Sequence, residues 1–191
     1  MKYDVITPPA EEPVTLDELK TQCNIFHDRL DAKLTSLGKA ARELVEIETA
    51  RCLVDTTIKV RLDYFDAYTI KLPIAYAKSV TSIFYRPGAG DELVEYTGFQ
   101  FSRGEPGRIR PPYAGWFPWT FATLDGVEIT CVCGYGAKED VPEGLKQAIL
   151  LLVSHWNENR EAVTFGPGTE LPIGVERLLN LYRWQGMGGA A

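Results

Sequence analysis

The hydrophobic period of the chain changes twice, and this change constrains the fold more than any other feature. Between Asp28 and Arg51, apolar residues recur at spacings of three and four, as on one face of an α-helix. From Ile58 to Tyr64, apolar and other residues alternate, as in a β-strand with one face in water. After Asp140 the helical period returns in DVPEGLKQAILLLVSHW. The pattern predicts helices, then strands, then helices.

Caps and turns place the individual elements. In PVTLDELKTQCNI, the Thr15 hydroxyl can accept from the Glu18 amide while the Glu18 side chain reaches back, a capping box that begins a short first helix. Asp140 is the expected cap of the third helix, with Pro142 in its first turn. The segment GVERLLNLYR predicts a short final helix. Further strands are predicted at TIKLP, SVTSIFY, ELVEY, FQFS, GRIR and GVEITCVCG.

These elements predict an α+β fold, in which a small helical core of two N-terminal and two C-terminal helices is interrupted by a large antiparallel β insertion. We assign the helical core to residues 1–55 and 135–185, the β insertion to residues 56–134, and a flexible tail to residues 186–191. A chain of 191 residues is long enough to bury roughly two-thirds of its unfolded surface. It therefore needs no covalent staple to fold.

Composition excludes several classes of protein. The chain has 20 Lys and Arg against 26 Asp and Glu, a net charge of −6, which is the wrong sign for tight binding to a phosphate backbone. No segment approaches the roughly 18 apolar residues of a membrane span, and MKYDVITPPAEEP lacks the apolar region of a signal peptide. We expect a cytosolic protein with no membrane partner. Its four cysteines, Cys23, Cys52, Cys131 and Cys133, form no C-x-x-C pair and are expected to be reduced and packed.

Two loops resemble binding motifs only in part. GYGAKEDVP has Glu139 where a dinucleotide fingerprint needs its third glycine, and FGPGTELPIG lacks the G-K-[ST] of a Walker loop. Nucleotide binding is therefore not predicted. PPYAGWFPWTF gathers five aromatic residues, and no Lys or Arg lies within residues 111–125. This aromatic segment either closes over the β insertion or forms an exposed patch that binds a partner.

The polar end of the third helix, in LLVSHWNENREAV, suggests either chemistry or contact. His155 and Glu158 lie one turn apart, as a general base and its orienting group would, or as two of the ligands of a metal site. Two ligands supply only half of a tetrahedral zinc site, and the other histidine, His27, is distant in sequence. A structural or interface role is the interpretation we favour.

The third helix is apolar on nearly all sides. Its main stripe consists of Leu145, Ala148, Ile149, Leu152, Val153 and Trp156, and both Leu150 and Leu151 lie outside that stripe. Such a helix must be covered on more than one side. Either it is the central helix of the domain, or a neighbouring subunit provides the second cover.

Four segments together resemble the head-tail connector family of tailed phages, also described as adaptor or head-completion proteins. They are VITPPAEEPVTLDELK, IKLPIAYAKSVTSIFY, CGYGAKEDVPEGLKQAILLLVSHWNENREAV and ELPIGVERLLNLYR. They run in order from about Val5 to Arg183. The family includes the adaptors of phage-derived gene transfer agents.

The resemblance implies a structural virion protein with no catalytic activity, no cofactor and no metal. Members form a homo-oligomeric ring, here expected to have roughly a dozen copies, on the portal protein. The ring extends the DNA channel, through which DNA passes without specific binding, and docks a downstream stopper or tail-terminator protein. The implied location is the head-tail interface of the virion, after assembly in the cytoplasm of the bacterial host.

The resemblance also implies roles for two sets of residues. The expected oligomer interface consists of Leu150, Leu151, His155, Glu158, Arg160 and Glu161. The expected portal-binding segment consists of Leu178, Leu179, Leu181, Tyr182, Arg183 and Trp184. The competing hypotheses are a small hydrolase or metal-dependent enzyme that uses His155 and Glu158, and a tail-associated module that binds glycans through its aromatic segment.

Overall fold

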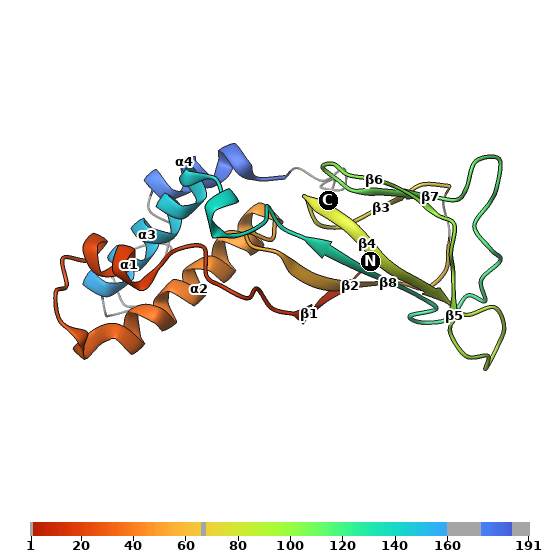
Figure 1. Cartoon of the computed structure of the whole chain (residues 1–191), viewed down its shortest axis with the longest axis horizontal. Coiled ribbons are helices and arrows are strands. Elements are labelled where there is room, and N and C mark those ends of the chain that lie inside the picture. The colour runs from red at the N-terminus through yellow and green to blue at the C-terminus, as the bar shows by residue number, and fades with distance from the viewer. Residues whose placement is uncertain (1, 66–67, 160–172, 185–191) are drawn as a thin grey trace. The chain divides into compact units, whose positions relative to one another are not determined.

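The computed structural model describes residues 2–65, 68–159 and 173–184 (Figure 1). The chain divides into two compact units. The helical unit comprises Glu11–Val54 and Gly136–Trp184, and the β unit comprises Met1–Ala10 and Asp55–Tyr135. The predicted α+β fold is confirmed. None of the helices in the described ranges combines the length and the apolar character that crossing a membrane requires.

The helical unit is built around its second and third α-helices. It contains α1 (Leu16–Gln22), α2 (Asp31–Thr49), α3 (Glu143–Glu158) and α4 (Ile173–Tyr182) (Figure 1). Short 3-10 helices at Asp28–Leu30 and Lys138–Asp140 precede α2 and α3. Both α3 and α2 pack against all the other helices of the unit, so α3 is covered on more than one side within its own chain. The core includes Leu34, Ala41, Val45, Leu145, Ile149, Leu152 and Leu179, all essentially inaccessible to solvent.

The start of α1 follows the sequence pattern. The Glu18 amide donates to Thr15 Oγ1 at 3.3 Å, and the Thr15 amide donates to Glu18 Oε2 at 2.6 Å, so the predicted capping box is confirmed. The hydrogen bond from the Thr15 amide lowers the pKa of the Glu18 carboxyl because it favours the ionised form.

The predicted cap of α3 is wrong. The helix begins at Glu143 after Pro142, and Asp140 does not cap it. Instead, Asp140 Oδ2 accepts from the Ala137 amide at 3.1 Å within the preceding 3-10 turn. The proline explains the shift, because a residue that precedes proline is driven out of the helical region, and Val141 is extended at φ −71° and ψ 127°.

The larger sheet of the β unit is antiparallel throughout. Its strands are β1 (Lys2–Thr7), β2 (Thr56–Leu62), β4 (Ala77–Tyr85), β5 (Val94–Glu95) and β8 (Val127–Cys133), in the order β1-β2-β8-β4-β5. On the central strand β8, alternate residues from Val127 to Cys133 are buried, as the period of two predicts. Cys131 and Cys133 lie on this face as thiols that form no disulfide, with their Sγ atoms 3.9 Å apart.

A second, smaller sheet lies in the same unit. Its strands are β3 (Ile70–Lys71), β6 (Gln100–Ser102) and β7 (Arg108–Arg110), in the order β3-β7-β6. Ile70 pairs with Ile109, and both are buried. A Cβ atom at Gly107 would lie 2.7 Å from the Cβ of Ala77 in β4, so the small sheet packs closely on the large one.

The structure differs from the sequence interpretation at the N-terminus. Residues 1–55 were assigned to the helical core, but β1 is an edge strand of the β unit and pairs Tyr3 with Val60. A short segment whose partner lies more than fifty residues away carries no local signal of that pairing. The expected flexible tail, residues 186–191, lies outside the described residues.

Candidate functional site

The end of α3 is a helix terminus whose polar groups bond within the unit. Asn157 Oδ1 accepts from Lys33 Nζ of α2 at 2.9 Å. The Asn159 side chain donates to the His155 carbonyl at 3.0 Å, and its Nδ2 lies 3.2 Å from His155 Nδ1. Arg160 and Glu161 lie outside the described residues. The structure therefore gives the described part of this cluster a role in ending α3 and joining it to α2.

The same region shows no activated nucleophile or metal cluster in the part of the chain that the structure describes. His155 and Glu158 are both exposed, and the ring contact of His155 is with an amide. No group of three His, Cys, Asp or Glu side chains there is placed to hold an ion. Burial raises the pKa of the Cys23 thiol, and the nearby Glu158 carboxylate raises it further, which keeps that thiol protonated and weakly nucleophilic.

Leu150 and Leu151 are half-buried in the helical unit. Because α1, α2 and α4 all pack on α3, the apolar residues outside the main stripe are explained by the cover that its own chain provides. A neighbouring subunit is not needed to account for them. Their assignment to an oligomer interface stays a prediction, which rests on the surface that each leucine still exposes.

The C-terminal segment is partly a core element. Leu179 is completely buried and contributes to the core of its own unit, so its predicted role in binding the portal stays a prediction. Val175 is buried one turn earlier on the same face of α4. Leu178 is half-buried, whereas Leu181 is 78% exposed. The sequence pattern did not separate these leucines, because the pattern alone does not show which face of so short a helix is covered.

The end of α4 and the residues after it are bonded to the end of α2 and to Arg51 beyond it. The Tyr182 carbonyl accepts from Arg51 Nε at 2.6 Å, and the Trp184 amide donates to the Thr49 carbonyl at 3.1 Å. Arg183 forms an ion pair with Glu48, with an N–O distance of 2.5 Å. Arg177, Asn180 and Leu181 are exposed at helical spacing on α4, and we call these three residues the α4 stripe.

An ion cluster joins the start of the unit to α2. Arg42, whose side chain is 11% exposed, donates to Glu12 at 2.8 Å and to Glu46 at 2.5 Å. Glu46 also accepts from the Leu53 amide at 2.9 Å. Burial raises the pKa of Glu46, and the Leu53 amide and Arg42 oppose that shift by favouring the carboxylate. These charges serve the fold, since each has its partner inside the unit.

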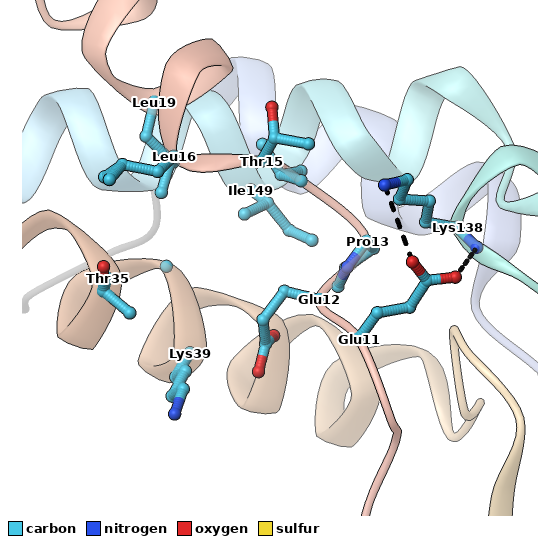
Figure 2. Close-up of a pocket in the computed structure, with 12 residues that line it drawn as sticks. Glu11, Glu12, Pro13, Thr15, Leu16, Leu19, Thr35, Lys39, Lys138 and Ile149 are labelled. Atoms are coloured by element: carbon cyan, nitrogen blue, oxygen red, sulfur yellow. Dashed lines mark hydrogen bonds and ion pairs between the residues drawn. The ribbon is translucent and has the colours of Figure 1, made fainter.

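A cavity of about 230 Å³ lies beside this cluster (Figure 2). Val14, Leu19 and Ile149 give it apolar walls, and Gly38 leaves room for Leu19, whose Cδ1 would lie 2.9 Å from a Cβ at that position. At its rim, Glu11 accepts from the Lys138 amide at 3.1 Å and pairs with the Lys138 ammonium (Figure 2). The cavity has an apolar floor, and Glu11, Glu12 and Lys138 at its edge are paired with other side chains, which suits packing better than chemistry.

The aromatic segment of the β unit has one packed ring and several exposed ones. Phe117 stacks on Phe65 with ring centroids 4.6 Å apart, which anchors the segment to the unit. Tyr113, Trp116 and Trp119 are 93%, 79% and 73% exposed. The expectation that this segment closes over the β insertion is thus met by Phe117 alone, and the other rings form an exposed apolar surface.

The small sheet carries a set of cations that the sequence analysis did not single out. Lys71 of β3 lies directly opposite Arg108 of β7, and Arg110 follows on the same exposed face. Arg110 Nε donates to Thr69 Oγ1 at 2.8 Å, and its guanidinium lies over the Tyr68 ring at 5.8 Å. We call Lys71, Arg108 and Arg110 the cationic strip. The segment GRIR indicated part of this strip in the sequence, since two arginines that are two residues apart on a strand share a face.

The chain is similar in structure to several solved proteins. One is a chain from the virion of a native gene transfer agent particle, with a TM-score of 0.79, 23% identity, and coverage of 100% of this chain and 99% of that chain. A second is a chain from the neck of an empty gene transfer agent particle, computed with C6 symmetry, with the same coverage, a TM-score of 0.79 and 24% identity. A third is a chain from the neck of a native particle, computed with C12 symmetry, with a TM-score of 0.73.

No model of a protein family matches the sequence, and no curated protein matches it. The structural similarity extends over the whole of both chains and establishes the fold.

Proposed function

We propose that this chain is a structural ring subunit in the neck of a phage-like particle, where it acts as a head-tail connector. The observation that carries the proposal is the similarity of the complete fold to chains of gene transfer agent particles, at a TM-score of 0.79 and with full coverage. The four sequence segments that resemble head-tail connectors are distributed over the same length. The subunit acts by contact, without catalysis and without a cofactor.

The proposed assembly is a ring of roughly a dozen copies seated on the portal protein of the same particle, in the virion, after assembly in the host cytoplasm. The C12 and C6 symmetry of the neck structures supports a ring of this size. Neighbouring copies in such a ring meet through heterologous surfaces, in which two different faces of the subunit are in contact. We assign one of these faces to the exposed parts of Leu150, Leu151, His155 and Glu158, continued by Arg160 and Glu161.

The portal contact is assigned to the α4 stripe together with Trp184. This refines the portal-binding segment expected from the sequence, because Leu181 exposes its side chain while Leu179 lies in the core. The downstream stopper or tail-terminator protein is assigned to the exposed rings at Tyr113, Trp116 and Trp119. A large exposed apolar surface is typical of sites that bind another protein.

Electron microscopy of the purified chain mixed with its portal tests the proposal. We expect rings that sit on one end of the portal. Persistent absence of such rings at high concentrations of both proteins would contradict it. A neck ring that forms only on the portal is compatible with a monomeric free chain.

The lateral face is tested with Leu151→Glu. A charge buried at an interface without a partner costs several kcal/mol, so this variant should fold yet form no rings. Gln147→Glu, at an exposed position one turn earlier on α3, is the matched control and should form rings as the unaltered chain does. Loss of folding in Leu151→Glu alone would assign Leu151 to the core of the helical unit.

A further inference from the structure

The cationic strip places like charges in positions that disfavour each other. Lys71 and Arg108 are register partners, and like charges directly opposite on one face of a sheet destabilise it. Arg110 adds a third positive charge on the same face, two residues from Arg108. The strands β3, β6 and β7 contain no Asp or Glu. Within the described ranges, no carboxylate forms an ion pair with Arg108 or Arg110.

In the large sheet of the same unit, cations form ion pairs with nearby carboxylates. Lys59 pairs with Glu128 at 2.6 Å, Arg61 pairs with Asp4, and Lys78 pairs with Asp55 at 2.9 Å. The residues of the β unit include nine Lys and Arg and ten Asp and Glu, so carboxylates are not scarce in it. Arg108 and Arg110 therefore differ from the three paired cations of the large sheet.

The groups around the strip are hydrogen-bond donors and small polar side chains. A hollow of about 190 Å³ on this face is lined by Gln100, Phe101, Ser102, Arg108 and Arg110. Guanidinium, hydroxyl and amide groups are the ones that contact phosphate and sugar in complexes with DNA. The strands of this face contain no Asp or Glu, so its charge is complementary to a phosphate backbone.

We propose that the cationic strip contacts the phosphate backbone of duplex DNA. The proposal rests on the function proposed above, because a neck ring surrounds the duplex that passes along its axis, and it assigns the outer face of the small sheet to the channel wall. The contact is independent of sequence, since neither lysine nor arginine at a phosphate reads base identity. Arg110 is held in place by Thr69 and Tyr68, which lowers the entropy lost on contact.

Binding by a single copy is weak and sensitive to salt. Each phosphate neutralised contributes about −0.9 to the slope of log affinity against log salt, so three cations give a slope of about −3 per copy. The net charge of −6 opposes binding by the chain as a whole. Weak contacts that exchange rapidly allow the duplex to move while the ring keeps it centred.

The test is an amide NMR titration of the free chain with a duplex of about 12 base pairs at about 20 mM salt, where phosphate contacts are strongest. We expect chemical-shift changes at residues 69–71, 100–102 and 108–110, which fade as the salt concentration rises. Absence of changes at these residues, or changes that are insensitive to salt, would overturn the proposal. This measurement does not require the ring to form.

Arg108→Gln/Arg110→Gln should remove most of these changes. The control Arg29→Gln/Lys39→Gln removes the same two charges from exposed positions of the helical unit and should leave them intact. Equal loss in both variants would mean that net charge alone is responsible, which also overturns the proposal. If the first variant lost its folded spectrum, Lys71→Gln alone should reduce the changes.

Ring formation by the same variants separates this proposal from the function on which it rests. Arg108→Gln/Arg110→Gln should form rings on the portal as well as the unaltered chain does. Failure of this variant alone to form rings would identify the strip as a contact with an acidic protein surface and would overturn the DNA assignment. Failure of the unaltered chain to form rings would contradict the proposed function, whatever the titration shows.

Discussion

The two units of the chain differ in how they use their polar and apolar groups. In the helical unit, Arg42 is surrounded by carboxylates, Arg183 pairs with Glu48, and Lys33 binds Asn157. In the β unit, the small sheet carries arginines with no ion pair in the described ranges, and three aromatic side chains are largely exposed. The helical unit uses these polar groups to join its own elements, whereas the small sheet and the aromatic segment of the β unit leave arginines and rings exposed to solvent.

This difference indicates where function lies. Clusters of charge on a helix suggest a site when they are read from the sequence, yet here they hold α2, α4 and the first segment together. The exposed rings of Tyr113, Trp116 and Trp119 give the β unit an apolar surface of the kind that a partner covers. We therefore interpret the helical unit mainly as a scaffold whose outward contacts are limited to the exposed parts of α3 and the α4 stripe.

The largest effect is expected at α4, where two neighbouring leucines have opposite roles. Leu179→Ala should lower the free energy of unfolding by about 3.5 kcal/mol, since it opens a cavity in a core that excludes water. Leu181→Ala should change it by less than about 0.5 kcal/mol and should weaken capture by the portal. Urea unfolding and portal pull-down measure the two quantities. Equal stability of the two variants would refute the assignment of their faces.

A second test removes the centre of the ion cluster. Arg42→Met should destabilise the chain by about 2.5 kcal/mol, because Glu46 is then buried without its cation. The double variant Arg42→Met/Glu46→Gln should recover a substantial part of the lost stability, since the side-chain oxygen of the new glutamine can still accept from the Leu53 amide. Chemical denaturation followed by circular dichroism measures both.

The matched control for the ion cluster is Lys39→Met, an exposed cation on the same helix, with an expected change below about 0.5 kcal/mol. A loss of less than about 1 kcal/mol for Arg42→Met would show that the cluster is peripheral to stability.

The aromatic segment provides the corresponding test in the β unit. Phe117→Ala should cost about 2 kcal/mol of stability through the lost stacking on Phe65 and the exposed surface it leaves. Trp116→Ala should leave the unfolding free energy nearly unchanged, because that side chain is mostly in solvent. Thermal unfolding of the two variants measures both losses of stability. If Trp116→Ala proved the more destabilising, the segment would not be anchored as described.

The smallest effect concerns the cap of α1. Thr15→Ala should cost about 1 kcal/mol, as loss of a capping side chain usually does. The pKa of Glu18 is lowered in the folded chain, so its contribution is complete above the ordinary value of 4.5 and is lost as the pH falls below it. Glu18→Gln should flatten the dependence of stability on pH in that range. An unchanged pH profile in this variant would remove Glu18 as its cause.

Elements whose signal is local were predictable from the sequence. The period of three and four from Asp28 to Arg51 corresponds to α2 and the 3-10 turn before it, and the alternation in GVEITCVCG corresponds to β8. The Thr15 capping box was predictable for the same reason. Asp140 was misassigned because the conformation before Pro142 overrides the preference of aspartate for a helix start.

Features that depend on distant pairing were not predictable. The strand β1 pairs with β2 across residues 8–55, and the burial of Leu179 depends on helices that are far away in sequence. The same holds for the cationic strip, since only the register of β3 with β7 brings Lys71 opposite Arg108. The apolar surface of α3 allowed two explanations, and the contacts of α1, α2 and α4 decide for cover within its own chain.

The most direct test of the central claim is the stoichiometry of the complex with the portal, measured by native mass spectrometry. The account predicts a single species in which roughly a dozen copies of this chain are bound to one portal ring, with few partly loaded intermediates. Independent binding of one or two copies, or no binding at concentrations well above those at which the portal is assembled, would contradict it.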